Sequence, residues 1–322
     1  MGQAIREAGA RVERGVDRGV VGVAGVVLAA AVGRPVVEGL LDRPAVGNWA
    51  TLFVALVLQA LPFLVLGIGI SAGVATLLPA GFLPRLLPRR RGLAVPAAAA
   101  AGMALPGCEC GSVPIARRMV GQGVPPAAAL AFMLAAPAVN PVVLVATAVA
   151  FPGRPAVVLA RLVASLLAAT VVGLVWSRWG DHQVAPMPTP ERSRFLATAQ
   201  HDLIDTGGFL VIGAAIAATL QTAVPRTVID SIADHGAVAV LALAGLAVVM
   251  AICSEADAFV AASLTQFSLA ARLTFLVVGP MVDVKLVAMQ AGTFGPRFAA
   301  RFAPLTLIVA VGTSAAVGWW LL

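Results

Sequence analysis

The chain has 322 residues, of which 60% are hydrophobic and 11% charged, and its mean hydropathy is +0.96. An ordinary soluble domain is about 45 to 50% apolar and about 25% charged. A water-soluble core of this size cannot bury so many apolar residues. Most of them must therefore face lipid or the inside of a membrane bundle. The composition excludes a soluble fold and predicts an all-α polytopic membrane protein.

The net charge of +7 is a topology signal rather than a nucleic-acid patch, because the 22 basic residues lie mainly between the apolar runs. The strongest basic cluster predicts a cytoplasmic loop and places the N-terminus inside, across two spans: Arg85, Arg89, Arg90 and Arg91. We therefore expect a multi-pass protein of the cell (inner) membrane, with the lipid bilayer as a partner and no nucleic acid.

The apolar runs give the expected membrane helices, since a span needs about 20 apolar residues. A weaker first span at 20–37 follows the basic N-terminus and is expected to be retained. The clean candidates are 52–78, 125–150, 157–177, 203–225, 272–294 and 302–322. Two further apolar regions, 93–122 and 236–267, are interrupted by polar residues.

The two interruptions are the informative part of the sequence. The first reads Pro-Gly-Cys-Glu-Cys-Gly at 106–111, and the second reads Cys-Ser-Glu-Ala-Asp at 253–257. Backbone polar groups cannot stay unpaired in lipid, so breaks that carry carboxylates must line a protein cavity or a water-filled path. We expect broken or re-entrant helices at both motifs.

The two breaks also indicate an internal duplication. An offset of 143 residues places Cys110 on Cys253 and Asn140 on Asp283, and an offset of 146 aligns the preceding helices. The expected organisation is a basic N-terminus with the first helix (1–50), a first half (51–178), a cytoplasmic linker (179–202) and a second half (203–322). A re-entrant first break makes the halves an inverted repeat, the preferred arrangement, whereas a full crossing makes a parallel repeat.

The polar residues of the breaks form a candidate site. Thiolates suit thiophilic ions such as zinc, copper(I) or trivalent arsenic, while carboxylates bind harder ions and carry protons. The alternative is that the cysteines are small buried packing residues. The candidate metal ligands are Cys108, Glu109, Cys110, Cys253, Glu255 and Asp257, and the candidate residues of the substrate path are Ser112, Asn140, Ser254, Asp283 and Lys285.

Lys285, the only lysine in the chain, needs an acidic partner at membrane depth, either Asp283 or a break carboxylate such as Asp257. The charge pair either senses occupancy of the site or only ties helices together. Asn140 either lines the site or caps a helix at Pro141. The sequence contains no phosphate-binding loop and no catalytic triad, which argues against ATP-driven transport and against an enzyme.

Three segments carry a family resemblance. The runs GCECGSVPIARRMVGQGVPPAAALAFMLAAPAVNPVV (107–143), ICSEADAFVAASL (252–264) and GPMVDVKLV (279–287) resemble the predicted-permease family that includes the methylarsenite efflux permeases. The match is closest to its CECG/CSEAD branch and covers roughly residues 50–320. The resemblance implies transport without ATP hydrolysis, a separate membrane-anchored partner protein, and a link to zinc. Glu109 departs from the arsenical branch.

The sequence thus predicts a membrane permease that moves a thiophilic metal ion, or a metal or metalloid complex, through a midplane site of cysteines and carboxylates. A transported ion of the zinc type is favoured, and no other cofactor is expected. One alternative is an organoarsenical efflux permease. The other is a non-transporting metal-sensing or scaffold subunit of a membrane complex.

Overall fold

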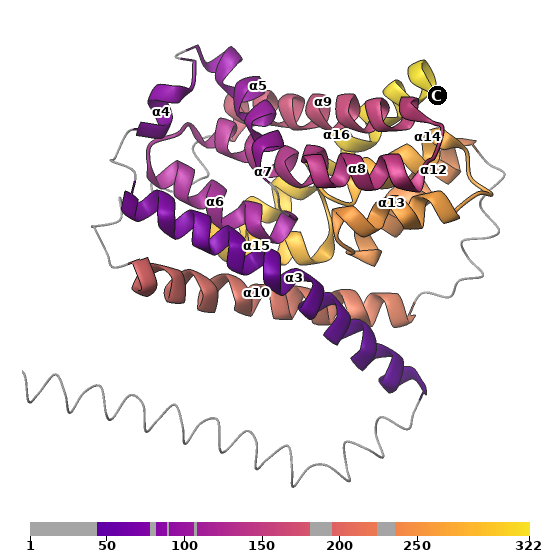
Figure 1. The fold of residues 1–322 in the computed structure, drawn as a ribbon, viewed down its shortest axis with the longest axis horizontal. Coiled ribbons are helices and arrows are strands. Elements are labelled where there is room, and N and C mark those ends of the chain that lie inside the picture. Colours follow the sequence, from indigo (N-terminus) through magenta and orange to yellow (C-terminus); the bar gives the residue numbers. More distant parts are fainter. Residues whose placement is uncertain (1–43, 78–81, 89, 106–107, 181–194, 224–235) are drawn as a thin grey trace, which may run out of the picture. The chain divides into compact units, whose positions relative to one another are not determined.

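The computed structural model describes residues 44–77, 82–88, 90–105, 108–180, 195–223 and 236–322 (Figure 1). The predicted first span at 20–37 and residues 181–194 of the predicted linker lie outside the described residues. Residues 52–322 form one structural unit, which contains all of the candidate site residues. Of the residues before this unit, the structure describes 44–51, the first turns of helix α3.

Every regular element in the described ranges is a helix. The first half contains α3 (Pro44–Leu77), α4 (Phe82–Leu86), α5 (Arg91–Ala101), the 3₁₀ turn η1 (Gly102–Ala104), α6 (Glu109–Gly121), α7 (Pro126–Val139), α8 (Pro141–Ala150) and α9 (Pro155–Trp179). The second half contains α10 (Phe195–Ala223), α12 (Gly236–Met250), α13 (Ser254–Ser263), α14 (Leu269–Val278), α15 (Val284–Phe294) and α16 (Pro296–Leu321).

Five segments of the described chain are long and apolar enough to cross a membrane: Ala45–Val74, Pro126–Ala150, Pro155–Trp179, Asp202–Thr222 and Pro296–Leu321. Three shorter apolar helices accompany them, at Gly92–Ala104, Ala237–Met250 and Leu269–Val278. The prediction of an all-α polytopic membrane protein is confirmed.

The lipid-facing and inward-facing sides of a span are visible on α3. Leu56, Ala60, Leu64 and Ile68 recur at helical spacing and are buried, whereas Val54, Leu58, Leu61 and Val65 are exposed. Both sets are equally apolar, because a helix in lipid gains nothing from a polar outer face. Hydropathy therefore locates this helix but does not say which side faces the protein.

Two regions expected as single spans are each split into two helices. Region 125–150 consists of α7 and α8, which meet at Asn140, and region 272–294 consists of α14 and α15, separated by residues 279–283. Pro141 explains the first break, since a proline disfavours helical backbone in the residue before it and Asn140 is extended. At the second break Gly279, before Pro280, is still helical, and Asp283, directly before α15, is extended. The predicted breaks in 93–122 and 236–267 are present, ahead of α6 and α13 respectively.

The two halves share one order of helices. The series α3, α5, α6, α7, α8, α9 corresponds in length and order to α10, α12, α13, α14, α15, α16. Asn140 caps α8 by accepting a hydrogen bond from the Val143 amide (2.9 Å), and Asp283 caps α15 by accepting one from the Leu286 amide (2.6 Å). The register of 143 residues is therefore correct for these two positions.

The register differs at the breaks. Cys108 precedes α6 at its N-cap, and Cys253 holds the same position before α13. Pairing Cys110 with Cys253 was therefore wrong at the level of structure. The starts of α6 and α7 lie 17 residues apart, at 109 and 126, but those of α13 and α14 lie 15 apart, at 254 and 269. This difference of two residues shifts the register.

Equivalent helices run in opposite directions, which identifies an inverted repeat. Trp176, near the end of α9, lies 5.1 Å between ring centroids from both Phe298 and Phe302, near the start of α16. Ser71, late in α3, lies 3.4 Å from Asp202, early in α10. Since α9 corresponds to α16 and α3 to α10, the second half is turned over relative to the first.

The helices that follow the breaks cross between the halves. Helix α6 of the first half packs against α15 of the second, and α13 of the second half packs against α8 of the first. Helix α9 also packs along α16. This exchange places the start of α6 and the start of α13 in the interior between the halves, where the candidate site lies.

Candidate functional site

The starts of α6 and α13 bring one cysteine from each half together. Cys108 and Cys253 both have extended backbone, and neither side chain caps its own helix, so both thiols are free to point elsewhere. Both are fully or almost fully buried and form no disulfide. The Cys108 thiol interacts with the thiols of Cys110 and Cys253. The two breaks thus meet in space, as one candidate site built from residues of both requires.

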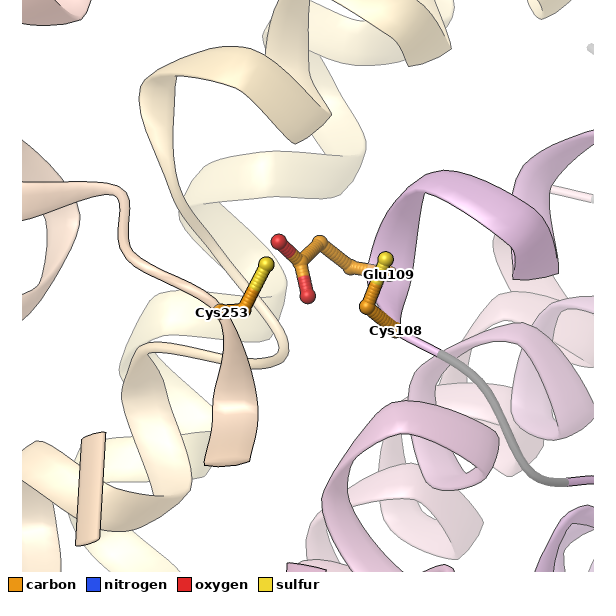
Figure 2. A group of neighbouring side chains, drawn as sticks. All are labelled: Cys108, Glu109 and Cys253. Carbon is orange, nitrogen blue, oxygen red and sulfur yellow. The ribbon is translucent and has the colours of Figure 1, made fainter. Parts of the chain in front are cut away.

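Three of the predicted metal ligands form one group. The ligand atoms of Cys108, Glu109 and Cys253 all lie within 4.8 Å of one another, and all three residues are buried (Figure 2). The group combines a thiol and a carboxylate from the first half with a thiol from the second. Two sulfurs and one oxygen at this separation are a donor set suited to zinc-type ions.

Helix geometry makes this position favourable for negative charge. Helices α6 and α13 both begin beside the group, with 13 and 10 residues respectively. The unpaired amides at a helix start give it a partial positive charge. Two such starts favour negatively charged ligand atoms at this position, as broken helices do in many transporters.

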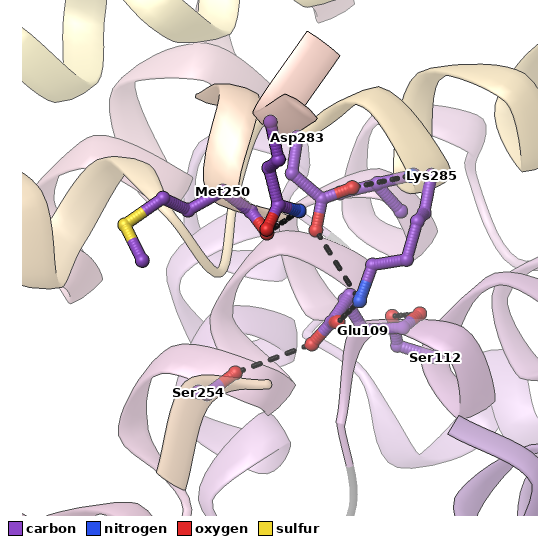
Figure 3. A network of polar contacts seen from close by, with 8 residues as sticks. Glu109, Ser112, Met250, Ser254, Asp283 and Lys285 are labelled. Atoms are coloured by element: carbon purple, nitrogen blue, oxygen red, sulfur yellow. Dashed lines mark hydrogen bonds and ion pairs between the residues drawn. The ribbon is translucent and has the colours of Figure 1, made fainter. Parts of the chain in front are cut away.

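Glu109 is the centre of a polar network (Figure 3). Its Oε1 accepts a hydrogen bond from Lys285 Nζ at 3.2 Å, and its Oε2 accepts one from the Ser254 hydroxyl at 3.3 Å. Ser112 donates to the backbone carbonyl of Glu109 at 2.9 Å. Lys285 and Ser254 belong to the second half, so the carboxylate of the first break is held by residues of the other half.

Both kinds of partner expected for Lys285 are present, Asp283 and a carboxylate of a break. Its Nζ lies 3.2 Å from Glu109 and 4.0 Å from Asp283 Oδ2. The break carboxylate that pairs with it is Glu109 rather than Asp257, which forms no ion pair with Lys285 among the described residues. The Lys285 side chain is 1% exposed and that of Glu109 is 0% exposed, so this pair is enclosed by protein.

Two of the other three predicted ligands, Glu255 and Asp257, lie in the first turn of α13. Asp257 is buried and Glu255 is half-buried, and both lie outside the group around Cys108. Asp257 Oδ2 and Glu255 Oε1 are buried without a hydrogen-bond partner among the described residues. Both carboxylates interact electrostatically with Arg161.

Arg161 is a buried residue of this region that sequence reasoning missed. It lies within α9 and is fully buried. Its Nη1 donates to Thr147 Oγ1 at 2.8 Å and its Nη2 donates to the Ser254 carbonyl at 3.1 Å. The signal was available, because a single arginine in the middle of an apolar span is costly and marks a partner or a path.

Asn140 acts as a helix cap in the structure. Besides capping α8 it donates from Nδ2 to the Ala136 carbonyl at 3.3 Å, across the α7–α8 break. Its side chain therefore forms hydrogen bonds with the Ala136 carbonyl and the Val143 amide, which the break leaves without helical partners. Of the two roles expected for Asn140, the cap is observed.

The buried charges do not balance. The network and its neighbours contain the acids Glu109, Glu255, Asp257 and Asp283 against the cations Arg161 and Lys285. Acidic groups thus outnumber basic groups four to two, and burying uncompensated charge is expensive. Such a region attracts a further cation or protons.

Comparison with known proteins agrees with this architecture. The chain matches the sequence profile of the predicted permease family over residues 45–318. The UPF0718 protein YcgR of Bacillus subtilis is 35% identical over 275 residues, which cover 81% of this chain and 93% of that protein. A Streptococcus mutans protein, 32% identical over 281 residues, covers 83% of this chain and 91% of its own length.

The Streptococcus mutans relative carries the provisional name of two-component membrane permease complex subunit. No solved structure matches the chain. The family profile covers most of the chain, including both breaks and the candidate site between them. The protein therefore belongs to the predicted permease family of multi-pass membrane proteins.

Proposed function

We propose that this permease moves a thiophilic divalent metal ion of the zinc type through the group formed by Cys108, Glu109 and Cys253, without ATP hydrolysis. The observation that carries the proposal is the convergence of these three ligand atoms within 4.8 Å in the protein interior. Two thiolates and one carboxylate are ligands that zinc accepts in proteins. The excess of buried acids favours a cation as the substrate.

The position of the group between inverted halves supports transport rather than fixed binding. One half supplies Cys108 and Glu109, and the other supplies Cys253. In transporters with inverted repeats, rocking of the halves exposes a central site alternately to the two faces of the membrane. A metal-sensing or scaffold subunit has no need for ligands divided in this way.

Glu109 also distinguishes a metal ion from an organoarsenical substrate. A neutral arsenical gains little from a buried carboxylate, whereas a divalent ion is stabilised by it. By the same argument, we assign the Glu109 carboxylate a role in binding the substrate rather than a purely structural role.

We further propose that the permease works in the cell (inner) membrane, with its N-terminus in the cytoplasm, together with a separate membrane-anchored protein. Support for the partner comes from the Streptococcus mutans relative, whose name describes one subunit of a two-component complex. The basic cluster around Arg90 supports the orientation, because arginines favour cytoplasmic loops.

The test is zinc uptake into vesicles that contain the purified chain and a zinc-sensitive dye, with and without the candidate partner. Cys108→Ser and Cys253→Ser are each expected to lower the initial rate at least about tenfold, because a hydroxyl is a poor zinc ligand. Magnesium, a hard ion, serves as the control substrate and is not expected to enter.

Cys110→Ser is the comparison variant, since this thiol is equally buried and contacts Cys108 but lies outside the group of three. We expect a smaller loss of zinc uptake from it than from the other two changes. An equal loss would add Cys110 to the ligand set. If the variant lacking both Cys108 and Cys253 still carried zinc at the normal rate, the proposed function would be wrong.

A further inference from the structure

The ammonium group of Lys285 lies between two carboxylates, one nearer to it than the other. Its Nζ is 3.2 Å from Glu109 of the first half and 4.0 Å from Asp283, two residues away on its own chain segment (Figure 3). Asp283 Oδ1 is already used as the cap of α15, but Oδ2 has no hydrogen-bond partner among the described residues. That second oxygen is available to the ammonium group.

The backbone of Lys285 is held in place by the neighbouring helix. A Cβ atom added at Gly213 of α10 would lie 2.7 Å from the Lys285 Cα, so the two backbones are in direct contact. The side chain, in contrast, ends beside both acids. A change of partner therefore needs only a rotation of the lysine side chain and no movement of α15.

Comparison of the two halves separates the cap from the charges. The first half has Asn140 where the second has Asp283, and Val142 where the second has Lys285. Asn140 caps its helix with the same hydrogen-bond pattern, so the fold of this break needs neither charge. The charges at 283 and 285 are therefore not required by the cap, which indicates a function other than capping.

Glu109 belongs both to this charge network and to the proposed ligand group. Its carboxylate pairs with Lys285, and the same carboxylate lies with Cys108 and Cys253 in the group of three. An ammonium group and a divalent ion that approach one carboxylate repel each other strongly in a protein interior. The two cations therefore compete for Glu109.

We propose that Lys285 is the tethered counter-cation of the metal site, paired with Glu109 before the metal ion binds and moved to Asp283 when it binds. The lysine keeps its proton throughout, so no bond to hydrogen is formed or broken. Return of the ammonium group to Glu109 then promotes release of the ion. This inference rests on the proposed function, because it assigns Lys285 a role at the proposed metal site.

The test is calorimetric binding of zinc ions to the purified full chain in detergent, with wild type, Lys285→Gln, Asp283→Asn and the double variant. Lys285→Gln removes the competitor and is expected to tighten zinc binding at least about tenfold, as expected for loss of a close charge pair. Asp283→Asn is expected to weaken zinc binding several-fold, because the lysine loses its second partner. The asparagine keeps the cap, as Asn140 does in the other half.

The double variant separates this role from direct ligation. If Asp283 acts only through Lys285, Asp283→Asn has no effect once the lysine is replaced. Equal weakening in both backgrounds would make Asp283 a ligand and overturn the proposal. Unchanged or weaker zinc binding by Lys285→Gln would also overturn it.

Lys285→Arg covers the case in which Lys285→Gln does not fold. The arginine keeps the positive charge and holds a carboxylate with two hydrogen bonds, so it is expected to weaken zinc binding. Unchanged binding by a folded Lys285→Arg protein would contradict the proposal. If wild type itself binds no zinc, the proposed function fails; if wild type binds zinc and the Lys285 variants bind it equally, only the present inference fails.

Discussion

Two buried cations hold the breaks of the opposite halves. Arg161 of the first half donates to the Ser254 carbonyl at the start of α13, and Lys285 of the second half pairs with Glu109 at the start of α6. The two cations do not occupy equivalent positions in the repeat, since Arg161 is on α9 and Lys285 on α15. The same cross-linking of the halves is thus achieved with two different side chains.

Replacement of Arg161 tests this arrangement. Arg161→Met leaves Asp257 buried without its nearby cation and removes the bond to the Ser254 carbonyl, so we expect a loss of about 3 to 5 kcal/mol in the free energy of unfolding. Adding Asp257→Asn should recover part of the loss, because the acid no longer needs compensation. Thermal unfolding in detergent, followed with a thiol-reactive dye, measures both effects. Equal stability of the single and double variants would show that Asp257 is not the partner of Arg161.

The sequence identified most of the buried polar residues but not their pairing. Lys285 and the acids of the breaks were evident, since charges stand out in apolar surroundings. Arg161 was overlooked, because a single arginine did not interrupt a run that met the length of a span. The pairing of Lys285 with Glu109 joins residues 176 positions apart and depends on how the halves pack, which no local pattern specifies.

At the level of elements, prolines and caps decide where the helices end. The segments around Asn140 and Asp283 were each expected to belong to one span, with a cap at Asn140 as one of two roles left open, because hydropathy averages over a window and tolerates one polar residue. Each is instead a helix end followed by a new, capped helix. The signal was present in the sequence, since an Asn before a proline is a typical helix start.

Close helix contacts at glycines give a prediction at this scale. An added Cβ at Gly67 of α3 would collide with the backbone of Gly111 on α6, and one at Gly213 of α10 with that of Lys285 on α15. Backbone cannot move aside easily, so Gly67→Ala and Gly213→Ala should each lower the free energy of unfolding by about 1 to 3 kcal/mol. Thermal unfolding in detergent provides the measurement.

Gly69 supplies the control for this experiment. It lies two residues from Gly67 on the same helix, and an added Cβ there meets nothing within 4 Å. Gly69→Ala should leave the stability unchanged or raise it slightly, because alanine favours a helix more than glycine does. Equal losses for Gly67→Ala and Gly69→Ala would show that α3 does not pack closely on α6.

At the scale of the whole molecule, the duplication was predictable and its detailed register was not. Asn140 and Asp283 align correctly, but Cys108, rather than Cys110, is the structural equivalent of Cys253. A constant offset of 143 residues favoured Cys110, whereas the starts of α6 and α7 lie two residues further apart than those of α13 and α14. The inverted arrangement, expected from a re-entrant first break, agrees with the antiparallel contact of Trp176 with Phe298.

A second contact between the halves lies away from the metal group. Arg118 near the end of α6 pairs with Asp202 at the start of α10, with Nη2 and Oδ2 2.8 Å apart, and Ser71 of α3 lies 3.4 Å from the same oxygen. The two charged side chains are 15% and 8% exposed, so water screens the pair only weakly. Because α6 also carries Glu109, this pair joins the helix of the site to the other half.

Exchange of the two charges provides the final prediction. Arg118→Asp or Asp202→Arg alone places two like charges together and should lower the free energy of unfolding by about 1 to 3 kcal/mol, less than for a fully buried pair. The double exchange restores the attraction and should recover most of the stability, which thermal unfolding will show. Zinc uptake by the recovered double variant then tests the role of the pair in transport: normal uptake means that the contact only joins the halves, and lost uptake means that its geometry matters when they move. Stability unaffected by either single reversal would contradict the contact itself.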